Sequence, residues 1–134
     1  MNALGNDISE SNNNTIIIVD DDEAVRDSLS ILLSLAGYAV NALKSGADLL
    51  VLLETKKSAQ QPDCLILDVH MPHMSGLDLV ETLNAKACKI PIILISGNID
   101  IATRARAKQL GISRLLEKPF SDELLFENIR KMIG

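Results

Sequence analysis

The run Leu65-Ile-Leu-Asp68-Val-His-Met-Pro72 contains three apolar residues that end in a single aspartate, with a Met-Pro turn just beyond it. Three other short apolar runs also end in polar residues. They lead into Asp20-Asp21-Asp22, Ser96-Gly97 and Glu117-Lys118-Pro119. Each apolar run predicts a buried strand, and the residues after it indicate a helix. In open parallel sheets the ligand site lies beyond the carboxyl ends of the strands, so we expect these polar residues at one edge.

Strand and helix patterns alternate five times along the chain. The expected strands are residues 15–19, 38–42, 64–67, 90–95 and 114–117, and the expected helices begin near residues 23, 46, 77, 101 and 122. Short connections imply right-handed crossovers, which predicts an α/β fold with a doubly wound five-stranded parallel sheet and helices on both faces. The strand at 38–42 ends in no reactive residue, so we expect it at an edge or remote from the site.

The composition is that of one ordinary globular domain. The chain has 134 residues, 47% of them apolar and 23% charged, which is enough for a single core. Residues 1–14 are polar and lack periodicity, so we predict a disordered tail followed by one domain over 15–134. Residues 56–62 are expected to form a polar loop.

Charge and cysteine content argue against several classes of function. The formal charge of −5 argues against direct nucleic-acid binding, which rewards positive faces. No apolar run approaches the ~20 residues of a membrane span, and no signal-peptide pattern opens the chain. Cys64 and Cys88 match no metal or redox spacing. We therefore expect a reduced, cytoplasmic setting without membrane contact.

Asp20, Asp21 and Asp68 are candidate metal ligands. Adjacent aspartates after a strand are more often a solvated loop than a ligand set. Asp68 favours the ligand set, because an unpaired carboxylate at the end of a buried strand is costly. Two carboxylates about 4 Å apart repel by roughly 1 kcal/mol in water and about 4 kcal/mol at an effective dielectric of about 20. The cluster is therefore expected to bind a hard cation, and Mg²⁺ suits it.

Ser96 and Lys118 complete the predicted site. A serine after a strand is usually a turn residue, and a lysine before proline is usually a solvated charge. At the same sheet edge they would instead supply a neutral donor and a cation for phosphoryl oxygens. Asp68 then becomes a candidate nucleophile, since carboxylates form aspartyl-phosphates. We expect Lys118-Pro119 to be a cis peptide that aims the ammonium inward.

Together these motifs resemble the receiver domain of bacterial two-component response regulators. The resemblance rests on Asp20-Asp-Asp-Glu23, Asp68-Val-His-Met-Pro72 with Ser75-Gly76, Ser96-Gly97 and Lys118-Pro-Phe120, in family order over residues 15–134. It implies a flavodoxin-like fold of the receiver type. It also implies that Asp68 accepts a phosphoryl group from the phosphohistidine of a sensor histidine kinase.

The resemblance implies further roles around Asp68. Asp21 binds Mg²⁺ directly, Asp20 helps through metal or water, and the main-chain carbonyl of His70 is a third protein ligand. Ser96 turns toward the phosphoryl group on activation, and Lys118 pairs with the phosphoryl oxygens. The cofactor implied is therefore Mg²⁺.

The implied activity is that of a signalling domain rather than an enzyme. Its own site accepts and loses the phosphoryl group, with no turnover of an external substrate. The implied partners are the kinase and a phosphorylation-dependent dimer or an output domain. The chain is most similar to receivers of helix-turn-helix transcriptional regulators. Whether it stands alone or is a piece of a longer regulator is left open.

The chain departs from the family pattern at a switch position in the fifth strand, where Leu115 replaces the common Tyr or Phe. The usual coupling, in which an aromatic ring rotates inward behind the hydroxyl, therefore takes another form. His70 and Asn98 stand at positions that modulate the lifetime of the phosphoryl group in this family. Asp22 and Glu23 are expected to begin a helix and not to bind the metal.

Three other interpretations fit the sequence less well. A haloacid-dehalogenase-type phosphatase would carry a second Asp two residues after the nucleophile, where this chain has His70. A flavodoxin would need a hydroxyl- and glycine-rich turn after the first strand, where the aspartates would repel its phosphate. A pseudo-receiver, an interaction module that never carries phosphate, is the main alternative. The intact set of site residues speaks against it: Asp20, Asp21, Asp68, Ser96 and Lys118.

Overall fold

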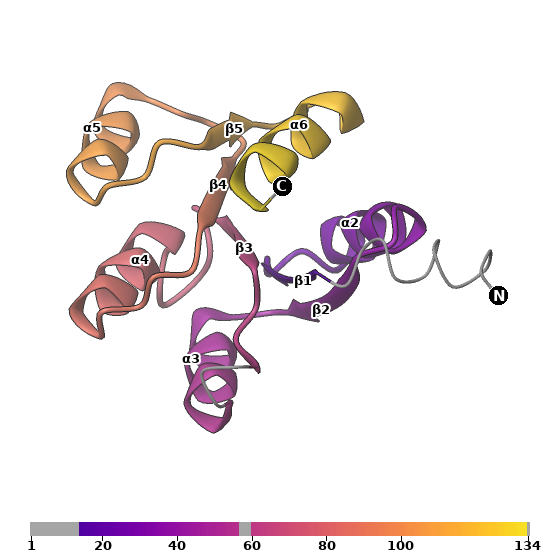
Figure 1. Ribbon diagram of the computed structural model, residues 1–134. Helices are drawn as coiled ribbons and strands as arrows, with labels where there is room; N and C mark the ends of the chain where they lie inside the picture. The colour runs from indigo at the N-terminus through magenta and orange to yellow at the C-terminus, as the bar shows by residue number, and fades with distance from the viewer. Residues whose placement is uncertain (1–13, 57–59, 134) are drawn as a thin grey trace, which may run out of the picture.

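The computed structural model describes residues 14–56 and 60–133. Its sheet has five parallel strands in the order β2-β1-β3-β4-β5 (Figure 1). The strands are β1 (Thr15–Val19), β2 (Ala39–Leu43), β3 (Cys64–Asp68), β4 (Ile92–Ser96) and β5 (Leu115–Glu117). Residues 1–13 of the tail predicted for residues 1–14, and residues 57–59 of the expected polar loop, lie outside the described residues.

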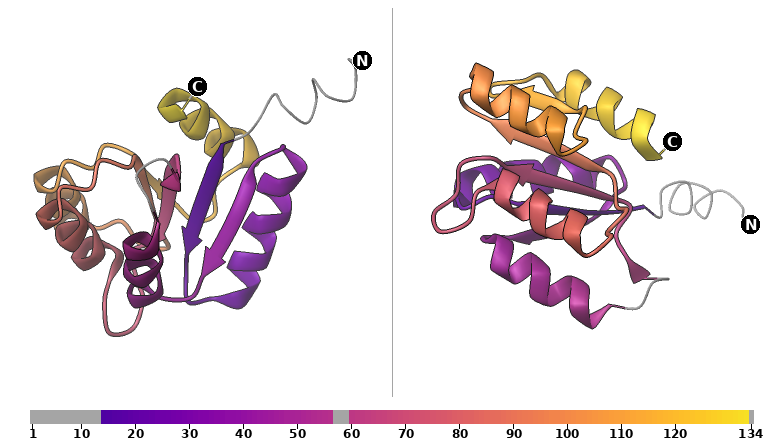
Figure 2. Two further views of the ribbon diagram at one scale, coloured as in Figure 1. Left: turned by 60° about the horizontal axis from the view of Figure 1, so that its bottom comes forward. Right: turned by 90° about the vertical axis from the view of Figure 1, so that its left-hand side faces the viewer.

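Helices cover both faces of this sheet. α2 (Glu23–Leu35) and α6 (Asp122–Ile133) lie on one face. α3 (Gly46–Thr55), α4 (Gly76–Ala85) and α5 (Ile101–Gln109) lie on the other, which faces the reader in the right-hand view of Figure 2. The predicted α/β fold, with a doubly wound five-stranded parallel sheet, is confirmed. β2 is an edge strand, as expected for the strand without a reactive residue.

The core consists of two aliphatic clusters, one on each face of the sheet. Successive strand residues point to opposite faces, so Ile17 joins the cluster under α3, α4 and α5, while Ile16 and Ile18 join the cluster under α2 and α6. All three isoleucines are fully buried. Burial on both faces explains why the central strands appear in the sequence as unbroken apolar runs.

β3 and β4 extend one residue further toward the carboxyl edge than the sequence indicated. β3 includes Asp68 and β4 includes Ser96, because backbone hydrogen bonds continue past the apolar run. The Val69 amide donates to the Ile95 carbonyl at 2.9 Å, and the Lys118 amide donates to the Ser96 carbonyl at 2.8 Å. Asp68 and Ser96 are therefore positioned by the sheet itself. The other differences are small: β2 lies one residue later than expected, and β4 and β5 begin two residues and one residue later.

The first helix begins immediately after the acidic run. Asp22 is the N-cap of α2, and its carboxylate accepts hydrogen bonds from the amides of Ala24 and Val25. This confirms Asp22 as a helix-start residue and separates its role from those of Asp20 and Asp21. The helix ends before Gly37, whose φ of 98° lies in the left-handed region that glycine adopts most readily.

Candidate functional site

Three carboxylates meet at the carboxyl edge of the sheet. Asp20 and Asp21 follow β1, and Asp68 ends the adjacent strand β3. One oxygen from each of the three lies within 4.8 Å of the others. Asp20 and Asp68 are buried, whereas Asp21 is exposed. The strand order changes direction between β1 and β3, and such switch points are where open parallel sheets bind ligands.

Asp20 is held on every side. It is fully buried, and its amide donates to the Leu43 carbonyl at 3.1 Å. One carboxylate oxygen accepts from the Asp22 amide at 2.9 Å, and the other accepts from the Lys118 ammonium at 3.2 Å. The Asp20 carbonyl accepts from the Arg26 guanidinium at 2.8 Å. Arg26 is a contact that the sequence reasoning missed.

Lys118 brings a positive charge to both buried carboxylates. Its Nζ lies 3.2 Å from Asp20 Oδ2 and 3.4 Å from Asp68 Oδ1. Burial alone would lower the pKa of Lys118, but the carboxylates of Asp68 and Asp20 outweigh that effect and raise it. The Lys118-Pro119 peptide is cis, as expected. The inward-pointing ammonium predicted from the Lys-Pro pair is therefore present.

The pKa of the Asp68 carboxyl group is shifted by its surroundings. Its pKa is raised by burial and by the neighbouring Asp20 carboxylate. The Lys118 ammonium and the backbone amide of His70 act in the opposite direction, because both interact favourably with the ionised form. An added divalent cation would favour the ionised form further, since opposite charges nearby lower a carboxyl pKa.

The loop after Asp68 packs closely on the end of β3. The Gly76 amide donates to the Val69 carbonyl at 3.0 Å, and a Cβ at Gly76 would collide with the backbone carbonyl of Asp68. The absence of a side chain at position 76 therefore lets α4 begin directly against the strand end. Ser75 and Asp78 close a capping box at this start.

Ser96 lies at the same edge, but its hydroxyl is engaged with its own loop. Ser96 Oγ donates to the Asn98 carbonyl at 2.9 Å and accepts from the Asn98 amide at 3.1 Å. The structure thus joins Asp20, Asp21, Asp68 and Lys118 directly and leaves Ser96 turned toward Asn98. His70 is exposed, and Leu115 is half-buried.

A comparison with models of protein families matches residues 16–130 to the response regulator receiver domain. The chain belongs to this family. The receiver domain is 37% identical over 115 residues to the transcriptional regulatory protein FixJ of Azorhizobium caulinodans, a match that covers 84% of this chain and 51% of that protein. The match to the response regulator protein TodT of Pseudomonas putida is 41% identical over 107 residues and covers 80% of this chain and 45% of TodT.

Solved structures agree with the family assignment. The crystal structure titled FixJ-N superposes with a TM-score of 0.79 at 33% identity, covering 90% of this chain and 93% of that one. The resemblance to response regulator receivers is therefore confirmed. The chain spans about half the length of the curated relatives it matches.

The residues of this receiver domain fit a hard divalent cation. All candidate side-chain ligands are carboxylate oxygens, the ligands that Mg²⁺ and Ca²⁺ prefer. Asp21 is exposed, so the cluster opens to solvent. Lys118 contributes one positive charge against three carboxylates. The remaining negative charge favours a bound cation.

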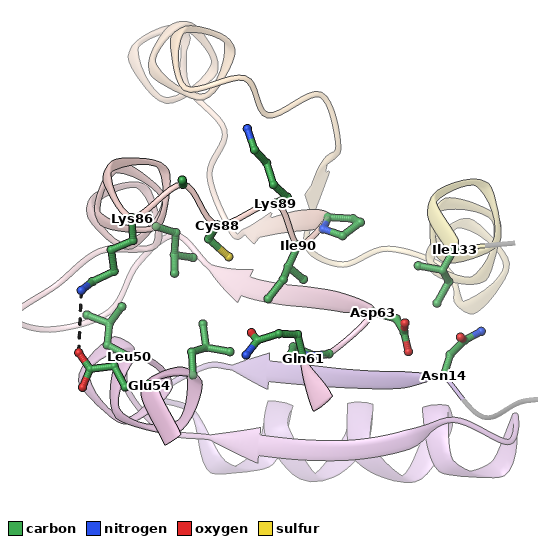
Figure 3. A pocket seen from close by; sticks show the side chains of 15 residues that line it. Asn14, Leu50, Glu54, Gln61, Asp63, Lys86, Cys88, Lys89, Ile90 and Ile133 are labelled. Carbon is green, nitrogen blue, oxygen red and sulfur yellow. Dashed lines mark ion pairs between the residues drawn. The ribbon is translucent and has the colours of Figure 1, made fainter. Parts of the chain in front are cut away.

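A cavity of about 760 Å³ lies at the amino ends of the strands, where Asn14 and Asp63 precede β1 and β3 (Figure 3). The three carboxylates lie at the carboxyl ends of the strands. Leu50, Glu54 and Lys86 line one end of the cavity, with Lys86 and Glu54 paired at 3.9 Å between α4 and α3. It contains none of the five side chains predicted for the site, so the cavity and the acidic cluster are separate features. Among the described helices, none is both long and apolar enough to cross a membrane.

Proposed function

We propose that this receiver domain accepts a phosphoryl group on Asp68 in a Mg²⁺-dependent reaction, with a sensor histidine kinase as donor. The observation that carries the proposal is the meeting of three carboxylates within 4.8 Å and an ammonium 3.4 Å from Asp68. A metal ion and a cation at one nucleophilic carboxylate are the parts that phosphoryl transfer needs, because catalysis there is mostly positioning and charge stabilisation.

In the proposed transfer, an Asp68 carboxylate oxygen attacks the phosphorus of a phosphohistidine. The P–N bond breaks as the P–O bond forms, and its electron pair stays on the departing imidazole nitrogen, which is protonated from solvent. Asp20, Asp21, Asp68 and the His70 carbonyl would hold Mg²⁺. The bound ion supplies charge neutralisation for the phosphoryl oxygens.

Lys118 and Ser96 would contact the new phosphoryl group in different ways. The Lys118 ammonium already touches Asp68, so we infer that it moves its contact to the phosphoryl oxygens. Ser96 would turn away from Asn98 and give up the 2.9 Å bond that its hydroxyl donates. That lost bond sets a cost of about 1 kcal/mol against the turn. Leu115 places no ring behind this hydroxyl.

The same site would end the signal. Attack of water on the acyl phosphate returns Asp68 and releases inorganic phosphate, so the domain needs no external substrate to turn over. His70 and Asn98 are the residues that we expect to tune the rate of this loss. We infer a cytoplasmic setting. We also infer that the phosphorylated domain passes the signal on by forming a dimer or by acting on an output domain. The name of the relative FixJ, a transcriptional regulatory protein, supports a transcriptional output.

Thermal melts test the metal half of the proposal. Mg²⁺ that binds only the folded chain stabilises it by mass action, so the melting temperature should rise with millimolar-range Mg²⁺. Asp21→Ala removes the exposed ligand and should erase the rise. Identical wild-type curves with and without Mg²⁺ would count against the site.

Acetyl phosphate tests the chemical half. With Mg²⁺ present, mass spectrometry should find one base-labile phosphate on the wild type, at Asp68, and none on Asp68→Asn. Phosphate that persists on the mutant would contradict the assignment of the nucleophile. A wild type that binds Mg²⁺ and never becomes modified would instead support the pseudo-receiver.

A further inference from the structure

Arg26 makes a contact that nothing in the proposed chemistry uses. Its Nη1 donates to the Asp20 carbonyl at 2.8 Å from half-buried surroundings. Arg26 lies in the first turns of α2, and its amide bonds to the carbonyl of the N-cap residue Asp22 at 3.0 Å. The side chain therefore reaches back from the helix across the turn that carries the acidic run.

The carbonyl that Arg26 holds belongs to the peptide unit joining Asp20 to Asp21. A peptide unit is a rigid plane, so fixing its carbonyl fixes ψ of Asp20 and φ of Asp21 together. Those two angles set where the two carboxylates point relative to each other. The other groups that hold Asp20 are the Leu43 carbonyl, the Asp22 amide and Lys118, and none of them touches this carbonyl.

We infer that Arg26 is a positioning residue for the metal site, rigidifying the Asp20–Asp21 peptide so that both carboxylates face Asp68. The inference rests on the proposed Mg²⁺ site. Groups that orient metal ligands from behind typically contribute about tenfold to a hundredfold in metal affinity. A single bond to a partly buried backbone carbonyl belongs at the lower end of that range.

The sign of the effect separates positioning from electrostatics. A guanidinium beside an acidic cluster repels a divalent cation, so removing its charge alone would tighten Mg²⁺ binding. Loss of the held peptide plane would weaken it. Weaker Mg²⁺ binding by a variant that has lost the charge can therefore come only from a change in geometry.

Arg26→Met is the sharpest test, because methionine keeps the apolar stem and removes both the charge and the donors. Arg104→Met is the matched control: Arg104 is exposed on α5, away from the acidic run. In Mg²⁺ titrations followed by amide NMR, Arg26→Met should bind about tenfold more weakly than the wild type. Arg104→Met should bind as the wild type does. Equal or tighter binding by Arg26→Met would overturn the inference.

A second readout needs no metal. In EDTA, the Asp22 amide, which donates to Asp20 Oδ1, should exchange faster in Arg26→Met than in Arg104→Met. Arg26→Lys keeps the charge with a shorter single donor. Its Mg²⁺ affinity and its Asp22 amide exchange rate should lie between those of Arg26→Met and Arg104→Met. If Arg26→Met does not fold, Arg26→Lys decides, and wild-type values in both measurements would refute the role of Arg26. A wild type that binds no Mg²⁺ would instead refute the proposed function, before any variant is compared.

Discussion

Lys118 Nζ lies 3.4 Å from Asp68 Oδ1 while it also holds Asp20 Oδ2 at 3.2 Å. One ammonium is thus shared by two buried carboxylates, and it does not balance their charge. The pKa of Asp68 is raised as a result of burial and of the Asp20 charge. A raised pKa means that ionised Asp68 costs stability in the folded chain, as is common where function requires clustered charge.

Asp68→Asn should therefore stabilise the metal-free domain at neutral pH. The substitution keeps the shape of the side chain and removes the repulsion with Asp20. We expect a gain on the order of 1 kcal/mol, or roughly 3–5 °C in melting temperature. Melts in EDTA measure it. A lower melting temperature for the mutant would show that the Lys118 pairing outweighs the repulsion.

The pH dependence of that gain follows from the direction of the shift. The folded state binds the Asp68 proton more tightly than the unfolded state, so metal-free wild type loses stability as pH rises above the ordinary value near 3.8 and through the raised pKa. Asp68→Asn lacks this loss. The stability difference between the two proteins should be largest at neutral pH and should vanish below about pH 4. A constant difference across pH would contradict the assigned pKa direction.

Gly76 is predicted to be intolerant of any side chain. A Cβ there would meet the Asp68 carbonyl, which is backbone and cannot move aside. Gly76→Ala should cost about 1–3 kcal/mol, as overpacking does elsewhere, and should disturb the loop that follows Asp68. Gly97 is the matched control, because a Cβ there meets nothing within 4 Å. The free energy of unfolding of Gly97→Ala, measured in urea, should lie within about 0.5 kcal/mol of the wild-type value. Equal costs at both positions would refute the steric argument.

Arg106 is predicted to tie α5 to α4. The only buried residue of α5 is Ala107, while the Arg106 guanidinium lies 2.9 Å from Asp78 Oδ1 and 3.6 Å from Glu81 Oε1 on α4. Exposed ion pairs contribute roughly 0.2–1 kcal/mol, and α5 has little apolar packing to compensate. Arg106→Gln should therefore speed amide exchange in α5 by about two- to fivefold.

Arg104→Gln and salt provide the controls for that tie. Arg104 is on the same helix and is exposed, so its loss should leave α5 exchange unchanged. High salt should move the wild type toward Arg106→Gln and have little effect on the mutant, because screening weakens exposed pairs. Identical exchange in the two variants would show that the ion pairs do not hold the helix.

The architecture could be predicted from sequence because its strands are buried on both faces. Short unbroken apolar runs such as Ile16 to Val19 and Leu65 to Leu67 are typical of central parallel strands, and parallel connectivity then brings their ends to one edge. The acidic cluster could be predicted because Asp20, Asp21 and Asp68 follow or end two of these strands. The predicted strand ends were one residue short at Asp68 and Ser96, since their last ladder bonds involve polar residues that carry no apolar signal.

What the sequence could not predict depends on the direction of side chains and on backbone contacts. Arg26 resembles any surface arginine of an amphipathic helix until its carbonyl partner is known. The hydroxyl of Ser96 donates to the Asn98 carbonyl, a local contact that the sequence does not indicate. Both outcomes depend on rotamers and on hydrogen bonds to main-chain groups, which hydrophobic periodicity does not encode.

Lys118→Ala should separate phosphorylation from output. Mg²⁺ binding should survive, because the three carboxylates remain and one competing cation is gone. A phosphoryl group adds about −1.5 to −2 charge, and Lys118 and Ser96 begin the loops that lead to α6 and α5. In the wild type, a beryllofluoride mimic of the phosphoryl group should alter amide exchange across residues 101–133 and favour association in sedimentation. In Lys118→Ala, both responses should be lost while Mg²⁺ still binds.

Lys44→Ala, which removes an exposed lysine after β2, is the control and should respond as the wild type does. If the changes in amide exchange in the wild type were confined to the acidic cluster of Asp20, Asp21 and Asp68, the α5–β5–α6 surface would be excluded as the output face.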